Sequence, residues 1–277
     1  MAKHKNLVRK PPLPTWIEPP FSVIDLVKEG AELVYDKEAE IRAEQKLIVH
    51  ASELASWCPR NFLFKDREMA RAARGLVKLV PSKVPASTRF LFDRGNAYHD
   101  MIRGYIRNTG TLYGNWKCLV CKHEAEGLAQ DFLECPECRS PHVIYDELSM
   151  TREYSGITVM GHCDAFIKNE VINPVVEIKS KNSRSFGYLA VPDSSHIIQM
   201  QVYLWLFRAR AGCILYVGED CAMKEYWYQW NPEFGKWVNE QLKQVSKLKD
   251  PHKAPRACIN DECTQASRCP WREECFE

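Results

Sequence analysis

The sequence has no long apolar run. Its most apolar stretches are interrupted by Lys, Arg or Gln within about ten positions, whereas a membrane-spanning helix needs about 18 or more apolar residues. The first ten residues are basic, but Pro11, Pro12 and Pro14 follow where a signal peptide would have its apolar stretch. We therefore expect no membrane partner, no secretory signal and a cytoplasmic location, in a bacterial or phage-infected cell.

The sequence also lacks a strong net charge. Its 38 Lys and Arg against 36 Asp and Glu give +2, so the overall charge favours no class of partner. Residues 60–107, however, contain eleven basic and four acidic residues. Such a segment is typical either of a solvated helix face or of contact with a nucleic-acid backbone. The candidate DNA contacts are Arg60, Arg67, Arg71, Arg74 and Arg94.

Cysteine, by contrast, is abundant, with twelve residues in a chain expected to be cytoplasmic. Disulfides do not persist in a reducing compartment, so metal ligation is the first interpretation. Four cysteines read CxxC, thirteen residues, CxxC, which predicts a closed zinc site with no open coordination position; they are Cys118, Cys121, Cys135 and Cys138. A redox dithiol pair is the alternative. We expect residues 111–142 to form an inserted zinc ribbon that contacts DNA or a protein partner.

The hydrophobic periodicity predicts helices and strands in alternation. We expect helices from Ser52 to Trp57, 59–80, Ser87 or Thr88 to Gly110, Ser194 or Ser195 to Arg210 with Gly212 ending it, and 232–248. We expect strands at 143–148, 153–160, 163–168, 175–179, 214–217 and 226–230. This order indicates an α/β or α+β fold. The predicted core spans 46–110 and 143–277, preceded by an N-terminal arm at 1–45.

The most informative stretch joins two acidic residues to a lysine. Asp164 is followed after twelve residues by Glu177-Ile178-Lys179. In a strand, Glu177 and Lys179 project from one face and Ile178 from the other. Carboxylates suit Mg²⁺ or Mn²⁺, and an adjacent ammonium suits phosphodiester hydrolysis. Alone the pattern is weak, because surface strands often alternate acids and lysines.

Three more residues accompany this pattern. His99 lies on a predicted helix, and Gln199 and Tyr203 are four residues apart on another. Together the set resembles the RecB-like branch of the PD-(D/E)XK nuclease superfamily over roughly residues 50–277, apart from the insertion. The resemblance implies a restriction-endonuclease-like core with a central mixed sheet flanked by helices.

By the same resemblance, each residue of the set has a role. Asp164, Glu177, His99 and the carbonyl of Ile178 would hold the divalent metal, Lys179 would be catalytic, and Gln199 and Tyr203 would orient Lys179 or the DNA. Cys163 stands where the family name has Pro, although Gly-x-x-Asp, present here from Gly161, is usual in this branch.

The remaining cysteines extend the resemblance to the iron-sulfur subgroup of these nucleases. One early cysteine, Cys58, and the tail pair Cys269 and Cys275 match its pattern, which implies a 4Fe-4S cluster. The subgroup has a further cysteine where this chain has Ala266. Cys258 or Cys263 would therefore complete the ligands. A second zinc site made by the tail cysteines alone is the alternative.

The expected function is that of a divalent-metal-dependent DNA exonuclease acting on single strands or duplex ends in recombination, repair or phage DNA metabolism. A nuclease that processes spacers in CRISPR adaptation would use the same chemistry and the same residues. A binding module without catalysis, using the zinc ribbon and the basic helices, is the third hypothesis.

Overall fold

The computed structural model describes residues 22, 25–29, 31, 47–77 and 85–277. Most of the predicted N-terminal arm lies outside this set, as do residues 78–80. The basic helix expected to reach residue 80 ends earlier, at Ala73, and residues 74–77 are not helical. Within the described residues, no helix combines the length and apolarity needed to span a bilayer.

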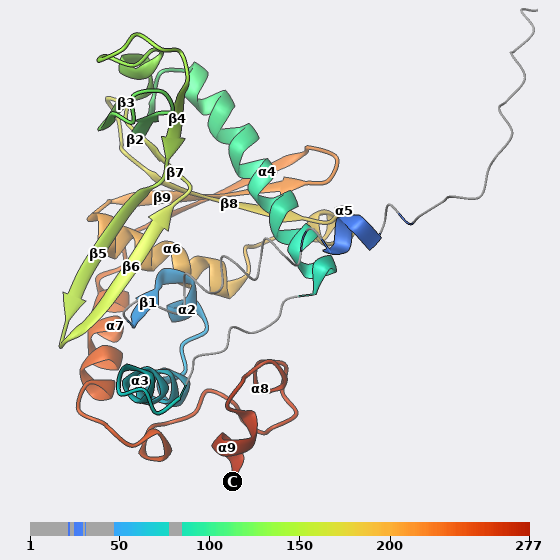
Figure 1. Cartoon of the computed structure of the whole chain (residues 1–277), viewed down its shortest axis with the longest axis vertical. Coiled ribbons are helices and arrows are strands. Elements are labelled where there is room, and N and C mark those ends of the chain that lie inside the picture. Colours follow the sequence, from blue (N-terminus) through green and yellow to red (C-terminus); the bar gives the residue numbers. More distant parts are fainter. Residues whose placement is uncertain (1–21, 23–24, 30, 32–46, 78–84) are drawn as a thin grey trace, which may run out of the picture.

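A seven-stranded mixed sheet forms the centre of the fold (Figure 1). Its order is β10-β9-β8-β7-β2-β3, with β4 paired to β2, and only β8 and β9 are parallel. The strands are β2 (Leu112–Cys118), β3 (Glu124–Leu128), β4 (Val143–Asp146), β7 (Ala165–Ile167), β8 (Val175–Lys181), β9 (Ala211–Gly218) and β10 (Met223–Gln229). A smaller sheet has the order β1 (Ile48–His50), β6 (Ile157–Cys163) and β5 (Leu148–Tyr154).

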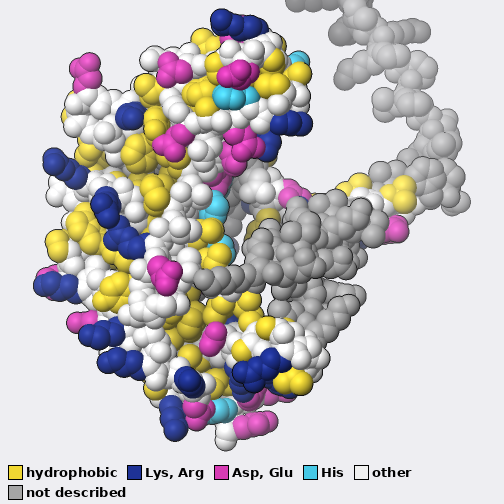
Figure 2. Space-filling view, turned by 60° about the vertical axis from the view of Figure 1, so that its left-hand side comes forward, with side chains coloured by type: hydrophobic (Ala, Val, Ile, Leu, Met, Phe, Trp, Pro, Cys, Tyr) yellow, Lys and Arg dark blue, Asp and Glu magenta, His cyan; other side chains and the backbone are white. Residues whose placement is uncertain are grey.

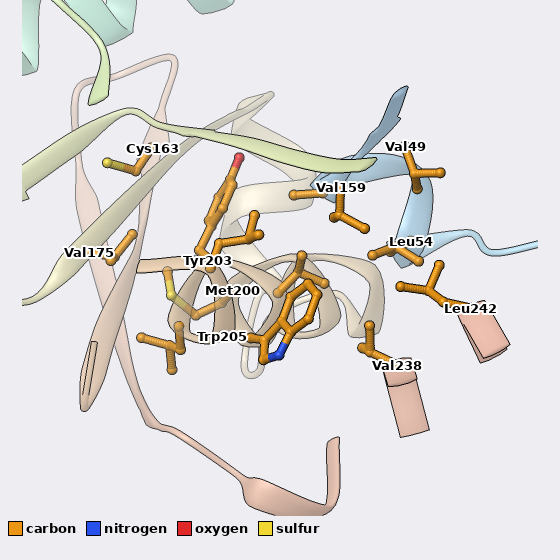
Figure 3. Packing of buried hydrophobic residues seen from close by; sticks show 14 of the residues in the cluster. Val49, Leu54, Val159, Cys163, Val175, Met200, Tyr203, Trp205, Val238 and Leu242 are labelled. Atoms are coloured by element: carbon orange, nitrogen blue, oxygen red, sulfur yellow. The ribbon is translucent and has the colours of Figure 1, made fainter. Parts of the chain in front are cut away.

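Two long helices cover opposite faces of the central sheet. Along β8, Val176 and Ile178 join the hydrophobic cluster beneath α4 (Ala86–Asn108), whereas Val175 joins the cluster built on α6 (Ser194–Phe207). Figure 3 shows the second cluster, with Met200, Tyr203 and Trp205 of α6 packed among residues of the smaller sheet. The predicted fold class, a mixed sheet flanked by helices, is confirmed.

Other helices surround this core. Two precede α4: α2 (Ala51–Ala55) and α3 (Pro59–Ala73). Two others adjoin the central sheet: α5 (Ser183–Gly187) and α7 (Pro232–Val245). The tail contains η2 (Pro251–Lys253), α8 (Thr264–Ser267) and α9 (Arg272–Phe276), and Figure 1 shows α8 and α9 beside α3, although about 200 residues separate them. Arg60 at the start of α3 bonds directly to this tail.

Three predicted boundaries were wrong. The strand expected at 153–160 is split by a turn at Ser155 and Gly156, both at positive φ. Helix α6 ends at Arg208, which adopts the left-handed conformation, and Gly212 lies inside β9. Gly161, which falls between the strands expected at 153–160 and 163–168, lies inside β6. Both strand positions hold glycine because neighbouring side chains occupy the space that a Cβ would need.

The segment expected as an insertion is continuous with the sheet. Its first strand, β2, pairs with β7 through Leu112 and Tyr113, and the hairpin partner β3 and η1 (Ala129–Phe132) follow. Arg107 of α4 donates hydrogen bonds to the carbonyls of Val143 and Phe132 and lies over the Trp116 ring. The ribbon is therefore fixed to both the sheet and α4.

Packing at Gly161 gives a test of the core. A Cβ there would lie 2.7 Å from Leu206 and 2.9 Å from the Tyr203 ring, both buried. We expect Gly161→Ala to lower the free energy of unfolding by about 1–3 kcal/mol, because the packed side chains must shift. Chemical denaturation measures this. Gly187→Ala is the control, since nothing lies within 4 Å of its Cβ position; equal stability of the two variants would contradict the packing argument.

Candidate active site and cysteine clusters

Asp164 stands where the chain passes from one sheet to the other. It separates Cys163, the last residue of β6, from Ala165, the first residue of β7. β7 pairs with β8 only through Ala165 and Phe166, so the ladder does not reach Ile178. The Ile178 backbone N–H donates instead to Asp164 Oδ2 at 2.6 Å. The buried carboxylate thus takes the place of a missing strand and is held against β8.

Glu177 and Lys179 project from the same face of β8, as the strand alternation predicted. Their side chains form an ion pair of 2.5 Å, and Glu177 is 3% exposed. Its Oε2 is buried without a hydrogen-bond partner among the described residues. Burial, and then the nearby charge of Asp164, raise the pKa of Glu177 to about 8, against the opposing effect of Lys179. The two buried carboxylates therefore lie close enough to disfavour each other's charged form.

His99 reaches the same point from α4. Its Nδ1 lies 3.2 Å from Asp164 Oδ1. Burial lowers the pKa of His99, but the hydrogen bond to Asp164 and the nearby carboxylate charges outweigh burial and raise it. The structure thus brings together His99, Asp164, Glu177 and Lys179 from α4, the β6–β7 junction and β8.

Glu147 is a residue that the sequence pattern did not reveal. Its carboxylate oxygen, the Asp164 oxygen and the His99 nitrogen all lie within 4.8 Å of one another. Glu147 follows β4 and pairs with Arg103 of α4 at 2.6 Å. It lies in a region that otherwise read only as strand, so no spacing to Asp164 marked it; only the folded chain places it at the site.

Gln199 and Tyr203 are adjacent on α6, as predicted. Gln199 Nε2 donates to the Tyr203 hydroxyl at 2.8 Å, and both residues are buried. Burial, with the charges of Glu177 and Asp164, raises the pKa of Tyr203 well above its usual range, so the phenol stays protonated. In Figure 3 its ring stands beside Cys163, directly before Asp164. The pair is therefore buried close enough to the carboxylates for their charges to act on the phenol.

A cleft of about 670 Å³ opens onto these residues. It is lined by the first half of α4, the end of β8 and the start of α6, including Asn96, His99, Lys179, Lys181 and His196. His196, also missed by the sequence analysis, bonds to the Tyr216 hydroxyl at 2.6 Å. Burial and the charge of Lys179 lower the pKa of His196 to about 4, so it is neutral at neutral pH.

The CxxC cysteines converge at the tip of the ribbon. The sulfurs of Cys118 and Cys138 are 3.6 Å apart, those of Cys121 and Cys135 are 3.5 Å apart, and all four lie within 4.8 Å. Four sulfurs bound to zinc at about 2.3 Å would be separated by about 3.8 Å. A backbone hydrogen bond from Cys121 lowers the pKa of Cys118 to about 6, which favours the thiolate. The group fits a tetrahedral metal.

The other cysteines gather between α3 and the tail. A small cavity there is lined by Cys58, Cys258, Cys269 and Cys275, but not by Cys263. The Sγ atoms of Cys269 and Cys275 accept hydrogen bonds from Asn61 and Arg60. Cys263 instead caps α8, accepting from the Ala266 N–H at 3.4 Å. The remaining three, Cys163, Cys213 and Cys221, lie in or near strands, and only Cys221 is exposed.

The five candidate DNA-binding arginines have different surroundings. Arg60 donates to the carbonyls of His252, Ala254 and Cys275, and Arg67 forms a two-pronged ion pair with Glu274. Arg71 pairs with Glu68, Arg94 with Glu219, and Arg74 is exposed at the end of α3. The structure therefore places the first two at the junction with the tail.

Comparison with known proteins adds a segment match and a fold match. No protein-family model matches the chain. The chain is 40% identical over 62 residues to "CRISPR-associated exonuclease Cas4" of Saccharolobus solfataricus (strain ATCC 35092 / DSM 1617 / JCM 11322 / P2), which is 22% of this chain and 29% of that relative. It thus spans under a third of that protein's length.

Among solved structures, SSO0001 aligns with a TM-score of 0.52 at 17% identity, covering 89% of this chain and 97% of the other. An alkaline exonuclease (LHK-Exo) from Laribacter hongkongensis aligns at 0.43 and 12% identity, covering 72% and 85%. The match to SSO0001 shows a shared fold. None of these matches supports a protein partner at the ribbon.

The contacts of Arg60 give a test. We expect Arg60→Met to loosen the tail and lower the free energy of unfolding by about 1.5–3 kcal/mol, because it removes charged hydrogen bonds to three carbonyls. Thermal denaturation and limited proteolysis of the tail measure this. Arg71→Met, which removes only a surface pair on α3, is the control. If the tail of Arg60→Met resists proteolysis as well as that of the wild type, Arg60 would instead be a candidate DNA contact.

Proposed function

We propose that this chain, whose fold is that of a RecB-like PD-(D/E)XK nuclease, is a divalent-metal-dependent DNA exonuclease. The observation that carries the proposal is the convergence of four side chains: His99 and Lys179 line one cleft, and the buried Asp164 and Glu177 pair with them directly behind it. Three separate elements supply them, and two carboxylates are buried at unfavourable electrostatic cost. A protein that only bound nucleic acid would need no such set.

The donor atoms fit a hard divalent cation. The donor atoms of His99, Asp164 and Glu147 lie within 4.8 Å of one another and would hold it, with Glu177 and the Ile178 carbonyl as the further predicted ligands. Oxygen-rich sets of this kind suit Mg²⁺ or Mn²⁺. The unpartnered Oε2 of Glu177 supports this assignment, because a buried carboxylate oxygen without a donor is costly unless a cation binds it. A bound ion would stabilise charge on the phosphate and acidify an attacking water.

The protein residues would position the rest of the reaction. Lys179, held by Glu177, faces the cleft and would orient the attacking water and stabilise the developing negative charge. The Asp164 carboxylate is fixed by the Ile178 N–H and by His99, so it cannot rotate away from the phosphate. Gln199 and the protonated Tyr203, on α6, would hold the carboxylates and Lys179 in position.

Basic residues at the cleft would contact DNA phosphates. Lys181 lines the cleft directly, and Arg94 lies beside it because its neighbours Asp93 and Gly95 line it. Of the α3 arginines, the exposed Arg71 and Arg74 are available for the backbone, whereas Arg60 and Arg67 hold the tail. We propose single strands or duplex ends as substrate, since a cleft of about 670 Å³ suits a strand end.

A CRISPR adaptation role, in which spacers are processed, is the second candidate function. The observation that favours it is the segment 40% identical to the CRISPR-associated exonuclease Cas4. Because both roles require the same chemistry, the site residues do not separate them. Cleavage of DNA by this protein alone would favour an independent exonuclease. Cleavage that requires a CRISPR integrase would favour spacer processing.

We propose a 4Fe-4S cluster held by Cys58, Cys258, Cys269 and Cys275. These four line one cavity, and Asn61 and Arg60 donate to two of the sulfurs, as hydrogen-bond donors around clusters do. The sequence left Cys258 and Cys263 open. The geometry favours Cys258, because Cys258 lines the cavity with the other three cysteines, whereas Cys263 lies outside the lining.

We propose zinc for the ribbon cysteines, since four thiolates without an open position suit a structural Zn²⁺ site. All twelve cysteines are free of disulfides, which supports a reducing, cytoplasmic location.

End-labelled single- and double-stranded DNA, linear and circular, tests the nuclease proposal. With Mg²⁺ or Mn²⁺ we expect the wild type to degrade linear DNA, and Lys179→Ala to keep DNA affinity while losing about 100-fold or more in rate, because the charge stabilisation is removed. Asp164→Ala should also lose cleavage. Lys236→Ala, on the exposed face of α7, is the control. A wild type that binds but never cuts, or a Lys179→Ala protein that still cuts, would refute the assignment.

The cluster proposal predicts a brown protein that absorbs near about 400 nm, because thiolate-to-iron charge transfer is coloured and zinc is not. Under anaerobic purification, Cys258→Ser should lose this absorbance and most of the iron. Cys263→Ser should retain both. A colourless wild type with two zincs per chain would instead favour a second zinc site, and the reverse response of the two variants would assign Cys263 as the ligand.

A further inference from the structure

A second cavity lies at the opposite end of α6 from the cleft. It measures about 680 Å³ and is lined by three arginines, which we call the arginine groove: Arg152 of β5, and Arg208 and Arg210 between α6 and β9. The cleft adjoins the start of α6 through His196. The chain advances twelve residues from His196 in the cleft lining to Arg208 in the groove lining, a distance of nearly 20 Å at about 1.5 Å per residue.

The charges of the arginine groove are not neutralised by the protein. No Asp or Glu lines it, and within the described part of the chain none of the three guanidiniums forms an ion pair. In contrast, Arg67, Arg94 and Arg103 each pair with a carboxylate. Figure 2 turns the side with β5 and the start of β9 forward, and on its left Lys and Arg outnumber Asp and Glu.

The backbone and rings around the groove are well fixed. The Arg152 guanidinium lies 4.7 Å from the centroid of the buried Trp205 ring. Arg208 ends α6 in the left-handed conformation with its N–H bonded to the Leu204 carbonyl, and the Arg210 carbonyl accepts from the Trp230 N–H at 2.9 Å. Trp230 packs against Gly235 of α7, where a Cβ would collide with its ring. The groove is therefore a formed concavity with aromatic walls.

Two of the three cations, Arg152 and Arg208, disfavour each other. Burial, and then the positive charge of Arg208, lower the pKa of Arg152. Bringing like charges together at a formed cavity is unfavourable unless an anion binds between them, and arginine is the side chain best suited to phosphate because its planar fork donates in pairs.

We propose that the arginine groove binds a phosphate-bearing segment of single-stranded nucleic acid outside the cleft. The volume of about 680 Å³ is enough for one or two nucleotides. Arginine and tryptophan together supply phosphate contacts and stacking surfaces, the combination that single-strand sites use. The inference rests on the proposed function, because it assigns the groove to another part of the same strand that the cleft would hold.

Two sites about 20 Å apart make binding depend on strand length. At the stacked spacing of about 3.4 Å per nucleotide, a strand must exceed about six nucleotides to reach both. A longer strand that contacts both sites gains affinity from the higher effective concentration of its second segment. A short oligonucleotide would occupy only one site.

Fluorescence anisotropy of labelled dT30 and dT5 on the Lys179→Ala background, which should not cut the probe, tests the inference. The variant pair is Arg208→Asn with Arg210→Gln; Asn is chosen because it tolerates the left-handed backbone. The control pair is Lys247→Ala with Lys249→Ala, which removes the same charge from exposed positions after α7. Circular dichroism checks that each protein is folded.

We expect the arginine pair to weaken dT30 binding about fivefold or more relative to the control pair, and to reduce the salt slope by about 1.4, since two phosphate contacts are lost. Binding of dT5 at the cleft should change less. Equal dT30 affinities for the arginine pair and the control pair would overturn the inference. If the background protein binds no DNA and the wild type cuts none, the proposed function itself fails.

Discussion

The hydrogen bond from the Ile178 N–H to Asp164 is the contact on which the site depends. It forms because β7 is only three residues long and leaves β8 before the ladder reaches Ile178. A backbone donor is thereby free inside the core, and the first residue available to satisfy it is the carboxylate at the passage between the two sheets. The same irregularity that ends the strand pairing fixes the carboxylate next to Glu177.

The consequence is a cluster of negative charge that the fold tolerates rather than avoids. Glu177 is buried beside Asp164, and Lys179 and His99 offset only part of the repulsion. Such an arrangement is costly for stability and useful for binding a cation, which is why perturbed carboxylates mark functional sites. The packing of α4 and α6 on the two faces of the central sheet stabilises the fold and offsets this unfavourable term. It also holds α4, the β6–β7 junction and β8 in place.

The two ends of the described core are joined by polar contacts rather than by a shared sheet. Arg60 and Arg67 of α3 bind the tail, and the cysteines of both segments line one cavity. A cluster there would link segments about 200 residues apart in sequence, and closing so long a loop favours the folded chain. Ala266 occupies the position at which the resemblance led us to expect a cysteine, and Cys258 lines the cavity from the loop before α8.

The sequence by itself determined the local features: the strand alternation that pairs Glu177 with Lys179, the QxxxY spacing on α6, and the CxxC pairs of the ribbon. These follow from periods of 2 and 3.6 residues and from short loops, which neighbouring residues alone decide. The tertiary structure decided whatever depends on packing between distant segments. Glu147 lies near Asp164 because it joins β4 to β5 at the site. Gly161 and Gly212 occupy strand positions at which side chains of α6 fill the space of a Cβ. Arg60 donates hydrogen bonds to carbonyls of the tail. No local pattern encodes these contacts, because each one requires the whole chain to be folded.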